Sequence, residues 1–181
     1  KHGILLIFDE VITGWGRTGS SFASIEYGVT PDIMTMAKAT TNGVVPMGVV
    51  ACRDEIYDSV MDASPLGSVE LFHGYTYSGI PVAVAAALAV QDIFEKEDIF
   101  TRAKNLAPYF QKGLFSLQDL DSVENIRGYG MMGGIDMKLN TKAGKAGYET
   151  FKSCYEAGVN FKATGAVSYT HLTLPTTYGV E

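Results

Sequence analysis

The chain has 181 residues, of which 46% are apolar and 19% charged, so it is long enough to bury a sizeable hydrophobic core and is not disordered. Its net charge of −6, without any basic cluster, excludes a sequence-independent nucleic-acid surface. No apolar run is long enough to cross a bilayer. The two cysteines, 52 and 154, have no metal-ligand spacing, which argues against a metal site or a disulfide scaffold and favours a reducing compartment, the cytoplasm.

The first part of the chain predicts strands that alternate with helices. Gly3–Phe8 is an apolar run that ends at Asp9 and Glu10, which is typical of a parallel strand buried on both faces. A glycine-rich loop over 13–21 follows it. Two further strands are expected at 33–36 and 48–52, and two helices at 54–61 and 81–95, the second with an Ala-rich first half buried on most sides.

From about residue 97 the pattern of elements changes. Helices are expected at 101–117 and 148–157, and strands at 132–137 and 159–163. We therefore predict an α/β fold in two parts. Residues 1–96 form an α/β layered domain, and residues 97–165 begin a second, smaller α+β domain.

The two ends of the chain suggest a fragment. The chain starts directly in an apolar segment without an initiator methionine, so we interpret its start as cut. The ten residues VSYTHLTLPT, 167–176, match the in-frame translation of a transposon-end adapter used to prepare sequencing libraries. We therefore interpret residues 166–181 as an artefactual tail, expect them to pack loosely and to continue no sheet, and assign His171 no function.

Two residues at strand ends carry the candidate chemistry. Asp9 and Lys38 follow two neighbouring strands, and the carboxyl ends of parallel strands are where open sheets bind ligands. Met34, Met36 and Ala37 surround the lysine with apolar groups, which would lower its pKa from about 10.4. Such an amine can form a Schiff base with an aldehyde cofactor, and a carboxylate opposite a pyridine nitrogen would keep that nitrogen protonated.

A second class of protein fits the same strand. An apolar run followed by Asp-Glu is also the magnesium-binding strand of P-loop ATPases. That interpretation requires a GxxxxGK[ST] loop, whereas the Gly144-Lys145 pair is followed by Ala146 and has Leu139 where the first glycine belongs. From the residues alone, both interpretations stay open.

Four strings, LLIFDEVITGWGRTG, YGVTPDIMTMAKATTNG, PMGVV and HGYTYSGIPVA, resemble the class III pyridoxal-phosphate-dependent aminotransferases of fold type I. Among these, the chain is most similar to the ω-amino acid:pyruvate (β-alanine:pyruvate) group. The resemblance runs from Lys1 to about Gly165 and implies that 1–96 is the later part of the cofactor-binding large domain. Residues 97–165 would be the start of the C-terminal domain. It also implies transfer of an amino group from an ω-amino acid or amine to a keto acid such as pyruvate.

The resemblance assigns a role to each matching residue. Lys38 matches the lysine that bonds to pyridoxal 5'-phosphate and then moves the proton. Asp9 matches the partner of the pyridine nitrogen, and Val11 the residue on the ring face. Thr76 matches the threonine that reaches the cofactor phosphate of the other subunit, which implies a homodimer. Lys162 stands where the family has an arginine for the substrate carboxylate, and lysine lacks the bidentate fork of arginine.

The resemblance also leaves alternatives within the cofactor class. Aminomutase or decarboxylase activity would use the same lysine and aspartate. A third hypothesis is a catalytically dead fragment, because the region expected to cradle the phosphate and close the pocket precedes residue 1. We expect the 181-residue chain by itself to be inactive.

Overall fold

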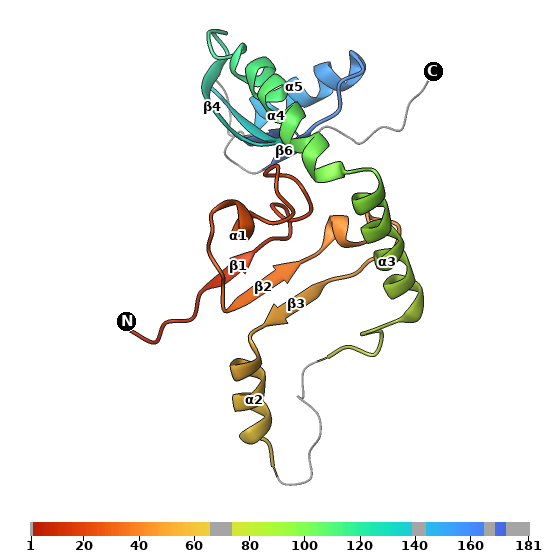
Figure 1. Cartoon of the computed structure of the whole chain (residues 1–181). Helices are drawn as coiled ribbons and strands as arrows, with labels where there is room; N and C mark the ends of the chain where they lie inside the picture. The colour runs from red at the N-terminus through yellow and green to blue at the C-terminus, as the bar shows by residue number, and fades with distance from the viewer. Residues whose placement is uncertain (1, 66–73, 139–143, 165–168, 173–181) are drawn as a thin grey trace. The chain divides into compact units, whose positions relative to one another are not determined.

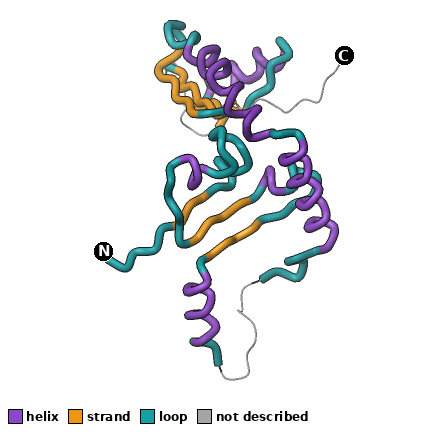
Figure 2. The backbone as a smooth tube through the Cα atoms, viewed as in Figure 1, coloured by secondary structure: helices purple, strands orange, loops and turns teal. Residues whose placement is uncertain are grey.

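The computed structural model describes residues 2–65, 74–138, 144–164 and 169–172 (Figure 1). The chain divides into two compact units. Unit 1 consists of residues 1–16 and 20–100, and unit 2 of residues 17–19 and 101–181. Figure 2 shows the helices and strands from which each unit is built.

Unit 1 contains a three-stranded sheet with the order β1-β2-β3. Its strands are β1 (Ile7–Asp9), β2 (Ile33–Met36) and β3 (Val49–Cys52). The pair β1 and β2 is parallel, with Asp9 opposite Thr35, whereas β3 runs antiparallel to β2. The predicted second and third strands are therefore confirmed, and the first two strands end at the same edge of the sheet.

The prediction for the first strand is wrong in length and in burial. The strand begins at Ile7, not at Gly3, and Ile4, Leu5 and Leu6 are 83%, 53% and 42% exposed. The physical reason is that, within the described ranges, only β2 pairs with β1, so no second neighbour covers the apolar run.

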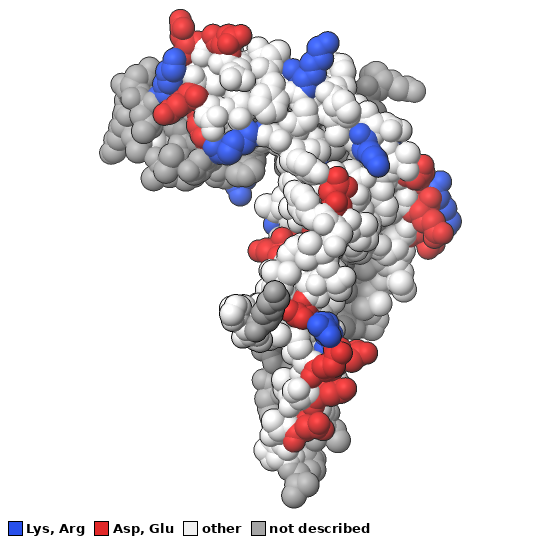
Figure 3. Space-filling model, turned by 60° about the vertical axis from the view of Figure 1, so that its left-hand side comes forward, with Lys and Arg blue, Asp and Glu red and all other residues white. Residues whose placement is uncertain are grey.

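The helical elements of unit 1 are the short α1 (Ala23–Glu26), the 3-10 turn η1 (Lys38–Thr40), α2 (Asp54–Asp62) and α3 (Pro81–Lys96). The predicted helices α2 and α3 are confirmed, and α3 packs against η1. The expected burial of the first half of α3 is wrong, because Ala83 is buried while Val82 and Leu88 are exposed. Acidic side chains gather along α2 (Figure 3), which has three aspartates and one glutamate among its nine residues.

Unit 2 packs helices against a four-stranded antiparallel sheet with the order β4-β5-β7-β6. Its helices are α4 (Ile99–Phe115) and α5 (Lys145–Glu156), and its strands are β4 (Val123–Tyr129), β5 (Met132–Met137), β6 (Lys162–Thr164) and β7 (Tyr169–Leu172). Leu114 of α4 lies in the core with Val123, Ile126, Ile135 and Met137. The predicted helices and the strands at 132–137 and 159–163 are confirmed within a few residues, whereas β4 was not predicted.

The expectation that the tail continues no sheet is wrong for residues 169–172. These residues form β7, which pairs on one side with β5 and on the other with β6. The edges of β5 and β6 present backbone N–H and C=O groups, and residues 169–172 become a strand because they hydrogen-bond to both edges. The rest of the predicted tail, 166–168 and 173–181, lies outside the described residues.

No helix within the described ranges is both long and apolar enough to cross a membrane.

Candidate active site

Asp9 lies at the carboxyl end of β1, with its side chain toward the neighbouring strand. Its Oδ1 accepts a hydrogen bond of 3.1 Å from the backbone N–H of Val11 and one of 3.4 Å from the hydroxyl of Thr35. The residue is exposed, and these contacts engage one of its two carboxylate oxygens. Asp9 can therefore accept a further hydrogen bond from a ligand at this edge of the sheet.

Glu10, the next residue, is a structural carboxylate. It is 1% exposed and accepts hydrogen bonds from the hydroxyl of Thr13 at 2.5 Å and from the backbone N–H groups of Ala23 and Ser24 at 3.0 and 2.7 Å. The last two are the first N–H groups of α1, which Phe22 at the N-cap leaves without a side-chain acceptor. Glu10 thus ties the start of the glycine-rich loop to α1, while Asp9 remains available at the strand end.

Lys38 follows β2 after a single residue and begins the turn η1. Its backbone lies in the left-handed region, with φ of 51°, which costs a residue with a side chain about 1–2 kcal/mol. The neighbouring contacts must therefore hold it there, as is common at functional sites. The apolar setting expected for this lysine is not found: Lys38 is exposed, because it lies on the outer side of a turn whose buried side is formed by Thr40 and Thr41.

Two buried threonines hold the turn that carries Lys38. Thr40 and Thr41 are 4% and 1% exposed. The hydroxyl of Thr40 donates to the carbonyl of Ala37 at 3.1 Å, and that of Thr41 donates to the carbonyl of Val45 at 2.6 Å. The carbonyl of Lys38 itself accepts a backbone hydrogen bond of 3.2 Å from Gly43. The backbone of the lysine is thus fixed on both sides while its amine is exposed.

The glycine-rich loop reaches this turn through Trp15. The indole Nε1–H of Trp15 donates a hydrogen bond of 3.0 Å to the hydroxyl of Thr40. Its ring lies 4.8 Å from the ring of Phe22 and 5.8 Å from the ring of Phe94, between centroids. No local sequence pattern indicates this contact, because its two partners lie 25 positions apart in the chain.

The other predicted site residues lie apart from one another along the chain. Val11 is half-buried, beside Asp9, to which its N–H donates. Thr76 is exposed in a turn that precedes α3, between Tyr75 and Tyr77, which are 82% and 78% exposed. Lys162 is exposed at the start of β6 and belongs to unit 2, whereas the other four predicted residues belong to unit 1.

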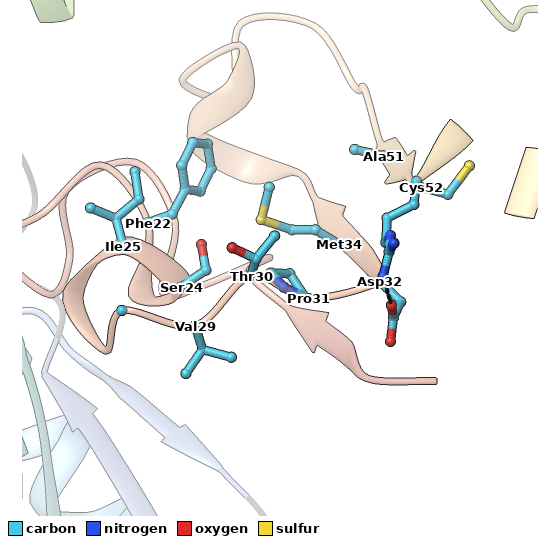
Figure 4. Close-up of a pocket in the computed structure, with 12 residues that line it drawn as sticks. Phe22, Ser24, Ile25, Val29, Thr30, Pro31, Asp32, Met34, Ala51 and Cys52 are labelled. Atoms are coloured by element: carbon cyan, nitrogen blue, oxygen red, sulfur yellow. Dashed lines mark hydrogen bonds and ion pairs between the residues drawn. The ribbon is translucent and has the colours of Figure 1, made fainter. Parts of the chain in front are cut away.

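An open pocket of about 570 Å³ lies at the other end of β2 and contains none of the predicted site residues. Figure 4 shows Phe22 and Ile25 on one side of it and Ala51 and Cys52 of β3 on the other. Asp32 at its rim accepts hydrogen bonds from the N–H of Leu6 at 2.7 Å and from Arg53 at 3.0 Å. The Leu6 N–H, and after it the Arg53 guanidinium, hold the pKa of Asp32 below its usual range.

The residues present fit pyridoxal 5'-phosphate at the carboxyl end of β1 and β2. Among the described residues, none donates a hydrogen bond to Oδ2 of Asp9, which leaves this oxygen for a protonated ring nitrogen, and Lys38 is exposed just beyond the adjacent parallel strand. The first is an acceptor for a pyridinium N–H, and the second is the nucleophile that an aldehyde requires.

Comparisons with known proteins agree with this interpretation. The family model of the class-III aminotransferases matches residues 1–178. The omega-aminotransferase of Caulobacter vibrioides is 45% identical over 168 residues, 92% of this chain and 38% of the relative. The beta-alanine–pyruvate aminotransferase of Pseudomonas aeruginosa is 50% identical over 138 residues, 76% of this chain and 31% of the relative. The chain thus spans about a third of the length of these curated relatives.

Solved structures show the same likeness in three dimensions. An (S)-enantioselective omega-transaminase from Thermomicrobium roseum superposes with a TM-score of 0.82 and 36% identity. The match covers 93% of this chain and 38% of the transaminase chain. An adenosylmethionine-8-amino-7-oxononanoate aminotransferase from Methanocaldococcus jannaschii gives a TM-score of 0.85 and 32% identity, over 95% of this chain and 41% of its own. These matches confirm the predicted α/β fold of fold type I and decide against the P-loop interpretation. The chain belongs to the class-III aminotransferases.

Proposed function

We propose that the full-length protein carrying this chain transfers an amino group from an ω-amino acid or amine to a keto acid such as pyruvate, with pyridoxal 5'-phosphate as cofactor. The observation that carries the proposal is that Asp9 is the last residue of β1 and that Lys38 follows the same end of the adjacent parallel strand β2. Relatives named as omega-amino acid–pyruvate and beta-alanine–pyruvate aminotransferases support the substrate class.

Each proposed role follows from the chemistry of a side chain. When bound, pyridoxal phosphate supplies an aldehyde and an electron-withdrawing ring. Asp9 holds the proton on the ring nitrogen, which lets the ring accept negative charge. Lys38 would hold the cofactor covalently through its Nζ, and the same Nζ, once free, would move the proton at the amine-bearing carbon of the substrate. Val11 packs against one face of the ring.

Two further roles complete the proposal. In a homodimer, the hydroxyl of Thr76 would donate a hydrogen bond to the phosphate of the cofactor bound by the partner subunit. The exposure of Thr76 in a turn supports a contact with another subunit. Lys162 supplies a positive charge for the substrate carboxylate. A single ammonium cannot grip both carboxylate oxygens in a plane as arginine does, so amines without a carboxylate compete as donors.

The test is covalent trapping of the cofactor. The full-length protein is incubated with pyridoxal phosphate and then with borohydride, which reduces the carbon–nitrogen double bond to a stable amine. We expect the added mass on the peptide that contains Lys38, and none in Lys38→Ala. Lys96→Ala, which removes an exposed lysine of α3, is the matched control and should be labelled normally. Labelling that persists in Lys38→Ala would remove this lysine from the mechanism.

The turnover of an Asp9 variant tests the proposed role of Asp9. With β-alanine and pyruvate as substrates, Asp9→Ala should retain its fold and lose turnover by roughly 100- to 1,000-fold or more, because an aimed charge is lost from the reacting group. Near-normal turnover of this variant would contradict the proposed role.

A further inference from the structure

The turn that carries Lys38 receives a chain of hydrogen bonds from the glycine-rich loop. The indole N–H of Trp15 donates to the hydroxyl of Thr40, and that hydroxyl donates in turn to the carbonyl of Ala37. The acceptor of the first hydrogen bond is the donor of the second, so the first bond polarises and strengthens the second. It ends on the peptide group that joins Ala37 to Lys38.

That peptide group sets the backbone of the lysine. Rotation about the N–Cα bond of Lys38 is measured relative to the plane of this peptide, and Lys38 has the uncommon φ of 51°. The carbonyl of Ala37 also accepts the backbone N–H of Thr40 at 3.1 Å. A donor that orients this carbonyl therefore favours the left-handed conformation from which the lysine side chain leaves the turn.

Trp15 is itself held in place independently of Thr40. Its backbone lies at φ of 62°, and its N–H donates to the carbonyl of Ser21 at 2.6 Å. Its neighbour Gly14 admits no side chain, since a Cβ there would lie 2.7 Å from the carbonyl oxygen of Glu10. The rings of Phe22 and Phe94 pack on the indole. The indole N–H is thus presented by a rigid support.

We infer that Trp15 is a positioning residue for Lys38, acting through the hydroxyl of Thr40 on the Ala37–Lys38 peptide. The inference rests on the proposed function of Lys38 and extends it to a residue that contacts neither substrate nor cofactor. It differs from a packing role for Trp15, because it assigns the effect to one N–H group and not to the aromatic ring.

Four variants of the full-length protein separate these roles. Trp15→Phe keeps an aromatic ring and removes the N–H, and Thr40→Val removes the hydroxyl at nearly constant volume. Thr40→Ser keeps the hydroxyl and is the rescue control. Phe94→Leu weakens the packing around the indole and leaves the hydrogen-bond chain in place, so it is the packing control.

The readout is the rate and the pH midpoint of borohydride-trapped labelling of Lys38 by pyridoxal phosphate, together with the melting temperature. Trp15→Phe and Thr40→Val should each slow labelling by roughly three- to tenfold, the worth of one hydrogen bond between neutral groups, and displace the pH midpoint in the same direction. The double variant should be no slower than the slower single variant, since both changes break one chain. Thr40→Ser should label like the parent, and Phe94→Leu should lower the melting temperature with the pH midpoint unchanged.

Two results would overturn the inference, and they are distinguishable. If the parent is labelled at Lys38 and Trp15→Phe labels at the parent rate and pH midpoint, Trp15 serves packing only, and the proposed function stands. If the parent itself takes no label at Lys38, the proposed function fails and the inference fails with it.

Discussion

The carboxylate of Glu10 accepts a hydrogen bond of 2.7 Å from the backbone N–H of Ser24, fourteen residues further along the chain. This contact fastens the beginning of the glycine-rich loop to α1, and so the loop returns to the sheet edge where Asp9 lies. The conformation of the loop therefore depends on the side chain of Glu10, which is only 1% exposed.

Glu10→Ala should destabilise the full-length protein strongly. The substitution leaves two N–H groups of α1 and the hydroxyl of Thr13 without their acceptor in a buried place, and we expect a loss of about 2–4 kcal/mol in the free energy of unfolding. Urea unfolding measures it. Glu95→Ala, an exposed site on α3, is the control and should change stability by less than about 0.5 kcal/mol. Equal effects of the two substitutions would be incompatible with the structure.

Leu114→Ala should open a cavity in the core of unit 2. Leu114 is 3% exposed and packs among four buried side chains of β4 and β5, so we expect a loss of about 2–5 kcal/mol. Leu106 lies on the same helix and is 40% exposed, so Leu106→Ala should cost clearly less. Thermal and denaturant unfolding of both variants make the comparison, and a larger effect at Leu106 would show that α4 presents a different face to the sheet.

Asp32 should contribute stability that depends on pH. Its pKa is lowered in the folded chain, by the Leu6 N–H first and by Arg53 second, so its contribution is present above the pKa of the unfolded chain, about 4, and is lost as the pH falls through the lower folded value. The stability difference between the parent and Asp32→Asn should therefore be largest near neutral pH and shrink below about pH 4. Urea unfolding as a function of pH gives this difference. Asp58→Asn, at an exposed position of α2, should show no such change.

Mixed dimers test the proposed role of Thr76. A subunit with Lys38→Ala and one with Thr76→Val are each deficient, but a dimer of the two has one site with an intact lysine and, from its partner, an intact threonine. Random mixing should restore about a quarter of the parent activity, since half of the dimers are mixed and each has one complete site. No gain above the Thr76→Val enzyme would place the threonine in the site of its own subunit.

Strands with simple patterns were predictable, and irregular ones were not. The apolar run of β2 at Ile33–Met36 was predicted with the observed bounds. In β4 the buried residues are Val123 and Ile126, three apart, because the register shifts between Val123 and Asn125. An irregularity of this kind removes the period of two by which a half-buried strand is recognised.

The candidate site also has a part that the sequence could predict and a part that it could not. The end of one strand and the residues after its parallel neighbour were expected to meet at one edge of the sheet, and β1 and β2 are indeed parallel neighbours. The roles of Asp9, Lys38, Val11, Thr76 and Lys162 stay predictions. The contacts of Glu10 with α1 and of Trp15 with Thr40 join residues 13 to 25 positions apart, so no local pattern could indicate them. One signal was available: adjacent residues at the end of a strand tend to point to opposite faces, so the pair Asp9-Glu10 favours one acid on each face of the sheet.

The central position of β7 in its sheet makes the segment at 162–164 dependent on chain that comes after it. Within the described residues, β6 is hydrogen-bonded to β7 alone, and β7 joins it to β5. A protein shortened at residue 164 would leave the backbone around Lys162 anchored by helix α5 and no longer by a ladder of strands. We therefore expect the backbone at Lys162 to be held less firmly in such a shortened protein, which would weaken the proposed contact between this lysine and the substrate carboxylate.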